Sequence, residues 1–149
     1  MNMSHPYSSL EAIVYDFTLD VRFADLDPYG HLNSAKYLDL VNTSRLIYLE
    51  REIGVKVSDL IERNIGFYMS KATQEFLRPV KGLQKINITS RVEDVQRGKL
   101  SIPYEIRDVS KTRIHSKGIL DYYVIDLTTQ KPTEMPSWMV EYFFHNIAG

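Results

Sequence analysis

The stretch at about residues 34–51 most constrains how this chain can fold, because its pattern is helical and it is apolar around most of its circumference. Asn33 precedes it as a good helix N-cap, and Gly54 follows it as a plausible stop. Only a narrow wedge of the helix is polar. The opposite side carries Tyr37, Leu40, Val41, Ser44, Ile47 and Tyr48. A helix with so little polar surface is predicted to be enclosed by other elements.

The flanking segments have the pattern of a sheet that encloses such a helix. Residues 15–23 alternate apolar and polar side chains, as a half-buried strand does. A short helix is expected at about 58–64. Further strands are expected at 66–78, 85–96, 100–106 and 113–127. Pro103 lies in the third of these, where it marks either an edge strand or a bulge.

This order of elements predicts the α+β class, with one curved, antiparallel, five-stranded sheet wrapped around one long central helix. The length of 149 residues suits a single domain. We expect its core at about 15–128 and a C-terminal helical extension at about 136–147, which Pro136 starts. Such a sheet leaves an edge and an apolar flank, so a homodimer is expected.

Composition argues against several functions. The formal charge of −1 gives no reason to expect binding to nucleic acid or to a membrane surface. The chain has no cysteine, no phosphate-binding loop and no nucleophile elbow, and its four histidines are far apart, so no metal or cofactor is predicted. We find no signal-peptide pattern and no apolar run near the roughly 20 residues that span a bilayer. A cytoplasmic protein is expected.

The segment DLDPYGHLN, residues 25–33, concentrates ionisable groups just before the predicted helix. Backbone N–H groups at a helix start are unpaired and the helix dipole is positive there, so developing negative charge is stabilised. The restriction that Pro28 places on Asp27 fixes the direction of its side chain. Such a carboxylate can activate water or attack directly, while the first-turn amides hold a carbonyl oxygen as it becomes an oxyanion.

The same residues also have ordinary structural explanations. Asp25 and Asp27 suit a plain turn. Asn33 suits a helix cap whether or not the loop is catalytic. His31 either orients the loop or takes part in the chemistry. Tyr37 fits a hydrophobic core as well as a binding surface.

The motif resembles the signature of hotdog-fold acyl-CoA thioesterases of the 4-hydroxybenzoyl-CoA thioesterase class, D-x-D-x-x-G-H-[VL]-N-[NS]-x-x-Y after a strand that ends in R-[FY]. The matching residues are Arg22, Phe23, Asp25, Asp27, Gly30, His31, Leu32, Asn33, Ser34 and Tyr37. A second match, EFLRPVKG at 75–82, resembles the strand of that family that ends in Arg-Pro. The resemblance spans about residues 17–127 and implies the hotdog fold and a thioester hydrolase.

By this resemblance Asp27 is the catalytic general base or nucleophile, and the backbone N–H of Ser34 polarises the thioester carbonyl. His31 and Asn33 complete the implied catalytic set. The related plant acyl-ACP thioesterases use an Asp, an Asn and a His in a D-x-N-x-H spacing; Asp27 and His31 match it, and Tyr29 stands in place of the Asn.

The resemblance further implies an acyl-CoA or acyl-carrier-protein thioester as substrate, and a homodimer or dimer of dimers with active sites at the subunit interface. Tyr37 is a candidate to line the acyl site. The candidates for the CoA phosphates are Arg78, Lys81, Arg91 and Lys117, which are equally explained as solvated strand residues. Two other functions stay open: a hotdog dehydratase, which needs a His and acid pair, and a non-catalytic acyl-thioester binding protein.

Overall fold

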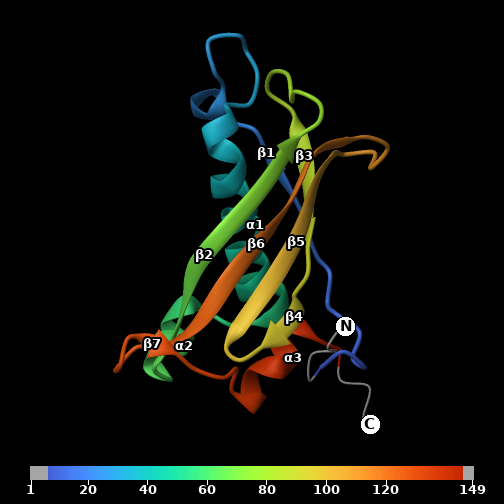
Figure 1. The fold of residues 1–149 in the computed structure, drawn as a ribbon. Coiled ribbons are helices and arrows are strands. Elements are labelled where there is room, and N and C mark those ends of the chain that lie inside the picture. The colour runs from blue at the N-terminus through green and yellow to red at the C-terminus, as the bar shows by residue number, and fades with distance from the viewer. Residues whose placement is uncertain (1–6, 146–149) are drawn as a thin grey trace.

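A computed structural model describes residues 7–145. A curved antiparallel sheet packs against one long helix, α1 (Figure 1). The strand order is β1-β3-β5-β6-β2, and two short strands, β4 and β7, pair with β5 and β6. The strands are β1 (Tyr15–Asp20), β2 (Ile65–Phe76), β3 (Lys85–Ser90), β4 (Glu93–Gln96), β5 (Lys99–Asp108), β6 (Ile114–Asp126) and β7 (Lys131–Pro132). The predicted α+β class and its five principal antiparallel strands are therefore confirmed.

The central helix spans the predicted stretch. α1 (Tyr37–Tyr48) is preceded by a 3-10 turn, η2 (Ser34–Lys36), and followed by a π-helical turn, η3 (Leu49–Ile53). Gly54 then ends the helix with a φ of +84°, a left-handed conformation that glycine adopts without strain. A second helix, α2 (Val57–Glu62), ends two residues before its predicted end at residue 64.

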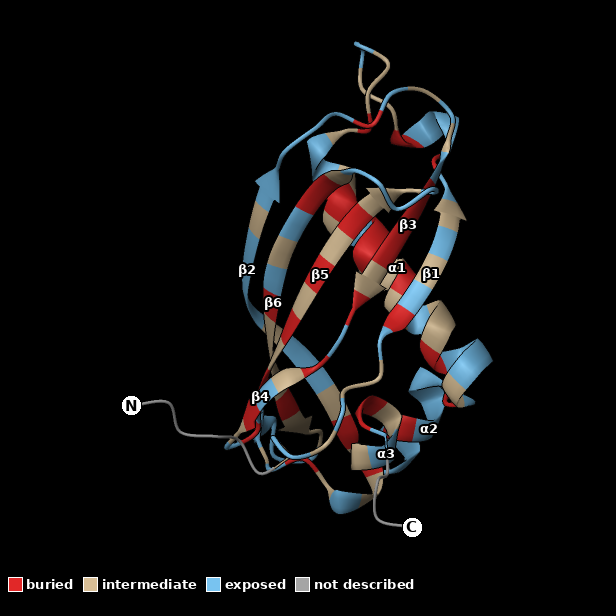
Figure 2. Cartoon of the chain, turned by 90° about the vertical axis from the view of Figure 1, so that its right-hand side faces the viewer, coloured by how far each residue is buried: buried red, intermediate tan, exposed pale blue. Residues whose placement is uncertain are grey.

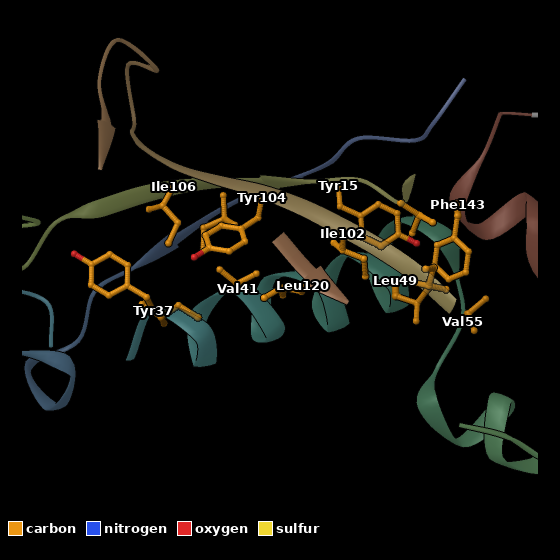
Figure 3. Packing of buried hydrophobic residues seen from close by; sticks show 14 of the residues in the cluster. Tyr15, Tyr37, Val41, Leu49, Val55, Ile102, Tyr104, Ile106, Leu120 and Phe143 are labelled. Atoms are coloured by element: carbon orange, nitrogen blue, oxygen red, sulfur yellow. The ribbon is translucent and has the colours of Figure 1, made fainter. Parts of the chain in front are cut away.

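The core lies between α1 and the concave face of the sheet (Figure 3). Along β5 every second residue is buried, from Leu100 to Ile106, as the alternating pattern predicts. Tyr37 and Val41 of α1 pack against this face. The helix is less enclosed than predicted, because Leu46 is 51% exposed. Its side of α1 borders an open pocket instead of a covering element.

β1 ends three residues before its predicted end. The carboxylate of Asp25 accepts hydrogen bonds from the backbone and side chain of Arg22, which folds the next residues into a 3-10 turn, η1 (Phe23–Asp25). The alternation therefore stops, and Phe23 is 82% exposed instead of facing the core.

The predicted strand at 85–96 is two strands, β3 and β4, and Pro103 explains the break. Pro103 lies in β5, between β3 and β6, and its carbonyl accepts a hydrogen bond from the Arg91 N–H at 3.3 Å. Proline has no N–H with which to return that bond. The ladder stops where Ser90 faces Tyr104 and resumes at Glu93. The predicted edge strand is therefore wrong. The other predicted alternative, a bulge at Pro103, does not form either, because the register is the same on both sides of the break, with Ser90 opposite Tyr104 and Glu93 opposite Ser101.

The C-terminal helical extension is shorter than predicted. A 3-10 turn, η4 (Ser137–Met139), leads into α3 (Val140–Phe143), and Phe144 is already extended and bridges to Ala12. Residues 146 and 147 of the prediction lie outside the described residues. Across residues 7–145, none of the helices has the length and apolar character needed to cross a bilayer.

Candidate active site

Asp25 is fully buried and holds its loop in shape. Its Oδ2 accepts hydrogen bonds from the Arg22 backbone N–H at 2.9 Å and Nε at 3.1 Å, and its Oδ1 accepts one from Nη2 at 2.8 Å. The hydrogen bond with the Arg22 side chain lowers the pKa of Asp25 below its usual value. The Asp25 carbonyl accepts a bond from the Asn33 N–H at 2.8 Å, so the two ends of the 25–33 segment are joined.

Asp27 is held at the base of a tight turn between these ends. Its Oδ1 accepts hydrogen bonds from the backbone N–H groups of Tyr29 (2.9 Å) and His31 (3.0 Å). The turn is closed by the Gly30 N–H, which donates to the Asp27 carbonyl at 3.0 Å, and Gly30 has a φ of +76°. Oδ2 of Asp27 accepts no hydrogen bond from the described residues. One carboxylate oxygen is thus fixed by the backbone and the other is available.

The helix start follows directly. Asn33 is the N-cap, and its Oδ1 accepts a hydrogen bond from the Ala35 N–H at 3.0 Å, as predicted. Ser34 is the first helical residue, and within the described part of the chain its backbone N–H donates to no acceptor. An unpaired amide at this position carries part of the positive end of the helix dipole.

An open pocket of about 490 Å³ lies where the turn, the helix start and the end of β2 meet. Six predicted site residues line it: Asp27, His31, Asn33, Ser34, Tyr37 and Arg78. Phe76 and Leu77 also line it and were missed from the sequence. Their signal was available, because they directly precede Arg78 in the EFLRPVKG motif.

Tyr37 belongs both to the core and to this pocket. Its side chain is buried, and its ring meets that of Phe76 edge to face with centroids 4.9 Å apart. Burial raises the pKa of Tyr37, and the nearby Asp27 carboxylate adds to that rise.

Arg78 also borders a second hollow of about 310 Å³, beside the first. Lys81, Arg113 and His115 contribute to its wall. The structure thus brings two predicted cations, Arg78 and Lys81, together near the loop. Arg113 was not predicted, and no local signal marks it, because its approach depends on the turn between β5 and β6.

Arg91 and Lys117 lie elsewhere. Both line a hollow of about 320 Å³ on β2, β3, β5 and β6 that shares no residue with the loop pocket. Nη2 of Arg91 is 2.7 Å from Oε1 of Glu93. The structure therefore does not bring these two cations to the Asp27 pocket. Among the described residues, no group of three or more His, Asp or Glu side chains is arranged to hold a metal ion.

The turn that holds Asp27 is tied to the connection between β2 and β3. The Leu32 N–H donates to the Val80 carbonyl at 2.8 Å, and the Gly82 N–H donates to the Gly30 carbonyl at 2.8 Å. His31 and Lys81 face each other in this short antiparallel bridge. We call residues 80–82 the clamp segment, because they pair with residues 30–32, the arm of the turn that follows Asp27.

Known proteins resemble this chain in sequence and in fold. The model of the thioesterase-like superfamily matches residues 21–143. The chain is similar to the long-chain acyl-CoA thioesterase FadM of Escherichia coli (strain K12), with 26% identity over 114 residues, which cover 76% of this chain and 84% of FadM.

Two solved structures from Staphylococcus aureus are also similar. One is a DHNA-CoA thioesterase, with a TM-score of 0.72, 19% identity and coverage of 87% of this chain and 83% of that chain. The other is the protein SAV2348 in complex with CoA, with a TM-score of 0.77, 12% identity and coverage of 89% of this chain and 83% of that chain. At these identities the similarity shows the fold.

The curved sheet around a central helix, together with these similar structures, shows that this chain has the hotdog fold. The chain belongs to the thioesterase-like superfamily. The predicted fold, the predicted family resemblance and the predicted enzyme class, a thioester hydrolase, are confirmed.

Proposed function

We propose that this protein hydrolyses acyl-CoA thioesters with Asp27 as the catalytic carboxylate. The observation that carries the proposal is that one pocket is lined both by Asp27, whose Oδ2 is available, and by Ser34, whose backbone N–H has no acceptor in the described chain. The similarity to FadM, an acyl-CoA thioesterase, and to a structure that holds CoA supports the substrate class.

In the proposed reaction the thioester carbonyl oxygen accepts a hydrogen bond from the Ser34 N–H, where the helix dipole stabilises the oxyanion. Asp27 Oδ2 takes a proton from water as the water oxygen bonds to the carbonyl carbon, or attacks that carbon itself to give an anhydride that water opens. The C–S bond breaks in either case. CoA leaves as a thiolate that takes up a proton, and the acyl group leaves as the free acid.

His31 and Asn33 have positioning roles in this proposal. The His31 N–H fixes Oδ1 of Asp27, which directs Oδ2 into the pocket. Asn33 caps the helix through its side chain, which leaves the Ser34 amide free for substrate. We propose that the CoA phosphates lie at the neighbouring hollow, where Arg78, Lys81 and Arg113 supply positive charge.

We also propose that two copies pair through β2. This edge strand has 12 residues, and most of its side chains are exposed (Figure 2). Phe67, Tyr68 and Phe76 are exposed aromatic residues on it. A long, unpaired edge strand with apolar side chains is a template for pairing, and antiparallel pairing with itself gives a closed two-fold dimer.

The test is thiol release from a panel of short, long and aromatic acyl-CoAs. We expect Asp27→Asn to lower kcat about 10²- to 10⁴-fold, because an amide neither accepts the proton nor attacks. Asp39→Asn is the matched control, since Asp39 is exposed in the first turn of α1 and does not line the pocket. It should keep the activity of the unmodified protein.

The rival functions give different results in the same experiment. Enoyl absorbance without thiol release from a 3-hydroxyacyl thioester would indicate a dehydratase. Tight binding of CoA esters with no turnover would indicate a binding protein. Unchanged hydrolysis by Asp27→Asn would remove Asp27 from the mechanism.

A further inference from the structure

A second, mostly apolar pocket of about 530 Å³ lies at the other end of α1. Its walls come from the second half of α1 and η3, from α2, from the start of β2 and from the inner face of β5 and β6. Its apolar lining includes Leu46, Leu49, Leu60, Ile65, Phe67 and Leu127. No residue is shared with the Asp27 pocket.

One charged side chain, Arg45, stands in this apolar lining. Its guanidinium carbon is 5.1 Å from the centroid of the Tyr15 ring, and its Nη1 donates to Ser90 Oγ at 3.0 Å. Among the described residues it forms no ion pair, and its other N–H groups donate to no protein acceptor. The titratable groups that face it are the phenols of Tyr15 and Tyr122.

A cation in this position calls for an anionic ligand. The Arg45 side chain is partly buried, and burial lowers its pKa because it disfavours the charged form. Without an ion pair among the described residues, the Ser90 hydroxyl and the Tyr15 ring compensate only part of this charge in an otherwise apolar wall. A guanidinium offers several N–H donors in a planar fork that matches a carboxylate. The ligand that satisfies both the apolar lining and the guanidinium is a hydrocarbon chain that ends in a carboxylate.

Asn42 extends the polar end of the pocket. It lines the pocket with Arg45, and its Oδ1 accepts a hydrogen bond from the Tyr122 hydroxyl at 2.8 Å. That bond fixes the amide, so its Nδ2 is left as a further donor. Arg45 and Asn42, three residues apart on α1, lie on the same side of the helix.

The two pockets have the same two elements as walls. Tyr37 of α1 and Phe76 of β2 line the Asp27 pocket, whereas Arg45 of α1 and Phe67 of β2 line the second one. Arg45 follows Tyr37 by eight residues, which is about 12 Å along a helix. An acyl group bound at Asp27 would have to extend over about this distance along α1 to bring its far end to the second pocket.

We propose that this second pocket receives the far end of the acyl group, and that Arg45 selects acyl groups whose far end is a carboxylate. The substrate class is then the CoA thioester of one end of a dicarboxylic acid. This assignment rests on the proposed thioesterase activity, and it adds a residue that determines specificity at a distance from the reacting bond.

The test compares matched substrates. Straight-chain acyl-CoAs of increasing length are each paired with the acyl-CoA of equal length that ends in a carboxylate, and kcat/KM is measured by thiol release. We expect the carboxylate series to be preferred about 10- to 100-fold, the effect of hydrogen bonds to a charged partner. Arg45→Met should remove this preference and spare the methyl-ended series, and Arg45→Lys should keep part of it.

Arg51→Met is the matched control. Arg51 lies in η3 at the end of the same helix and stacks on an aromatic ring of β1, with its guanidinium carbon 5.9 Å from the Phe17 centroid, but it does not line the pocket. It should leave the preference unchanged. Circular dichroism establishes that each variant is folded. The preference of the unmodified protein for the carboxylate series tests the proposal even if a variant fails to fold.

Equal kcat/KM for the two series in the unmodified protein would overturn the proposal, as would equal losses for both series in Arg45→Met. Binding of free dicarboxylic acids to Asp27→Asn, measured by calorimetry, separates this proposal from the thioesterase itself. If no acyl-CoA is hydrolysed but the diacid binds and Arg45→Met abolishes that binding, the thioesterase fails and the carboxylate site stands.

Discussion

Asp25 and Asp27 are two residues apart and have opposite surroundings. Asp25 is buried against Arg22, whereas Asp27 is held by backbone amides at the edge of a pocket. The D-x-D spacing predicts both acids in one loop but does not say which of them is enclosed. That depends on how Arg22 folds back over the 3-10 turn. The contact joins residues only three apart, but the alternating pattern of residues 15–23 predicts a strand there instead of a turn. The Asn33 cap, by contrast, was predictable because an N-cap bonds within its own helix turn.

Asp25→Asn should destabilise the protein by roughly 1.5–3 kcal/mol at neutral pH, because it removes charge-assisted hydrogen bonds to a buried group. The pKa of Asp25 is lowered in the folded state, so its stabilising effect is complete above the ordinary aspartate pKa of about 4 and is lost as pH falls through the folded value. Urea denaturation at pH 7 and below pH 4 measures this. The difference between the two proteins should shrink in acid, and a constant difference would contradict the assigned role.

Among the elements, α1 and the sheet differ in how far sequence determines them. The helix limits follow from Asn33 and Gly54, which act locally. The break between β3 and β4 arises from Pro103 in the neighbouring strand, so the sequence of the broken strand does not contain it. Leu46 remains exposed although its side of α1 is apolar, because the helical pattern shows which residues avoid water but not what covers them.

Alanine substitutions at two glycines distinguish the stability cost of backbone strain from that of steric crowding. Gly54→Ala should cost about 1–2 kcal/mol, since its positive φ is unfavourable for alanine while a Cβ there meets nothing within 4 Å. Gly118→Ala should cost more, because a Cβ would lie 2.2 Å from the Thr73 carbonyl oxygen and 2.6 Å from the Tyr104 ring. Chemical denaturation of both variants gives the comparison. Equal losses of unfolding free energy in the two variants would show that the sheet shifts enough at Gly118 to relieve the crowding.

For the molecule as a whole, the long exposed edge of β2 is unpaired within the described part of the chain. The proposed homodimer rests on the predicted sheet edge, but site residues that come from distant elements do not follow from sequence. Arg113 reaches the hollow beside the Asp27 pocket only through strand pairing. Arg91 is separated from Arg78 for the same reason, because it lines a hollow formed by other strands.

Ala72→Lys should convert the proposed dimer to a monomer. Ala72 is exposed near the middle of β2, and antiparallel self-pairing brings the middle of the strand close to its own copy, so the added lysine and Lys71 of both copies repel one another. Sedimentation of the unmodified protein and the variant measures the mass. Val109→Lys, exposed outside the strands, is the control and should stay dimeric. A monomeric unmodified protein would refute the β2 pairing.

The clamp segment limits which chain segments can be exchanged between this protein and its relatives when a chimaera is built. Connections between strands usually accept insertions because they run over the surface. Residues 80–82 are bonded to residues 30–32, and the His31 backbone in that arm is bonded to Asp27. An inserted residue therefore shifts those bonds and moves the carboxylate without touching it. A chimaera that takes the β2–β3 connection from a relative should therefore take residues 25–33 from the same relative, because the two segments are hydrogen-bonded to each other.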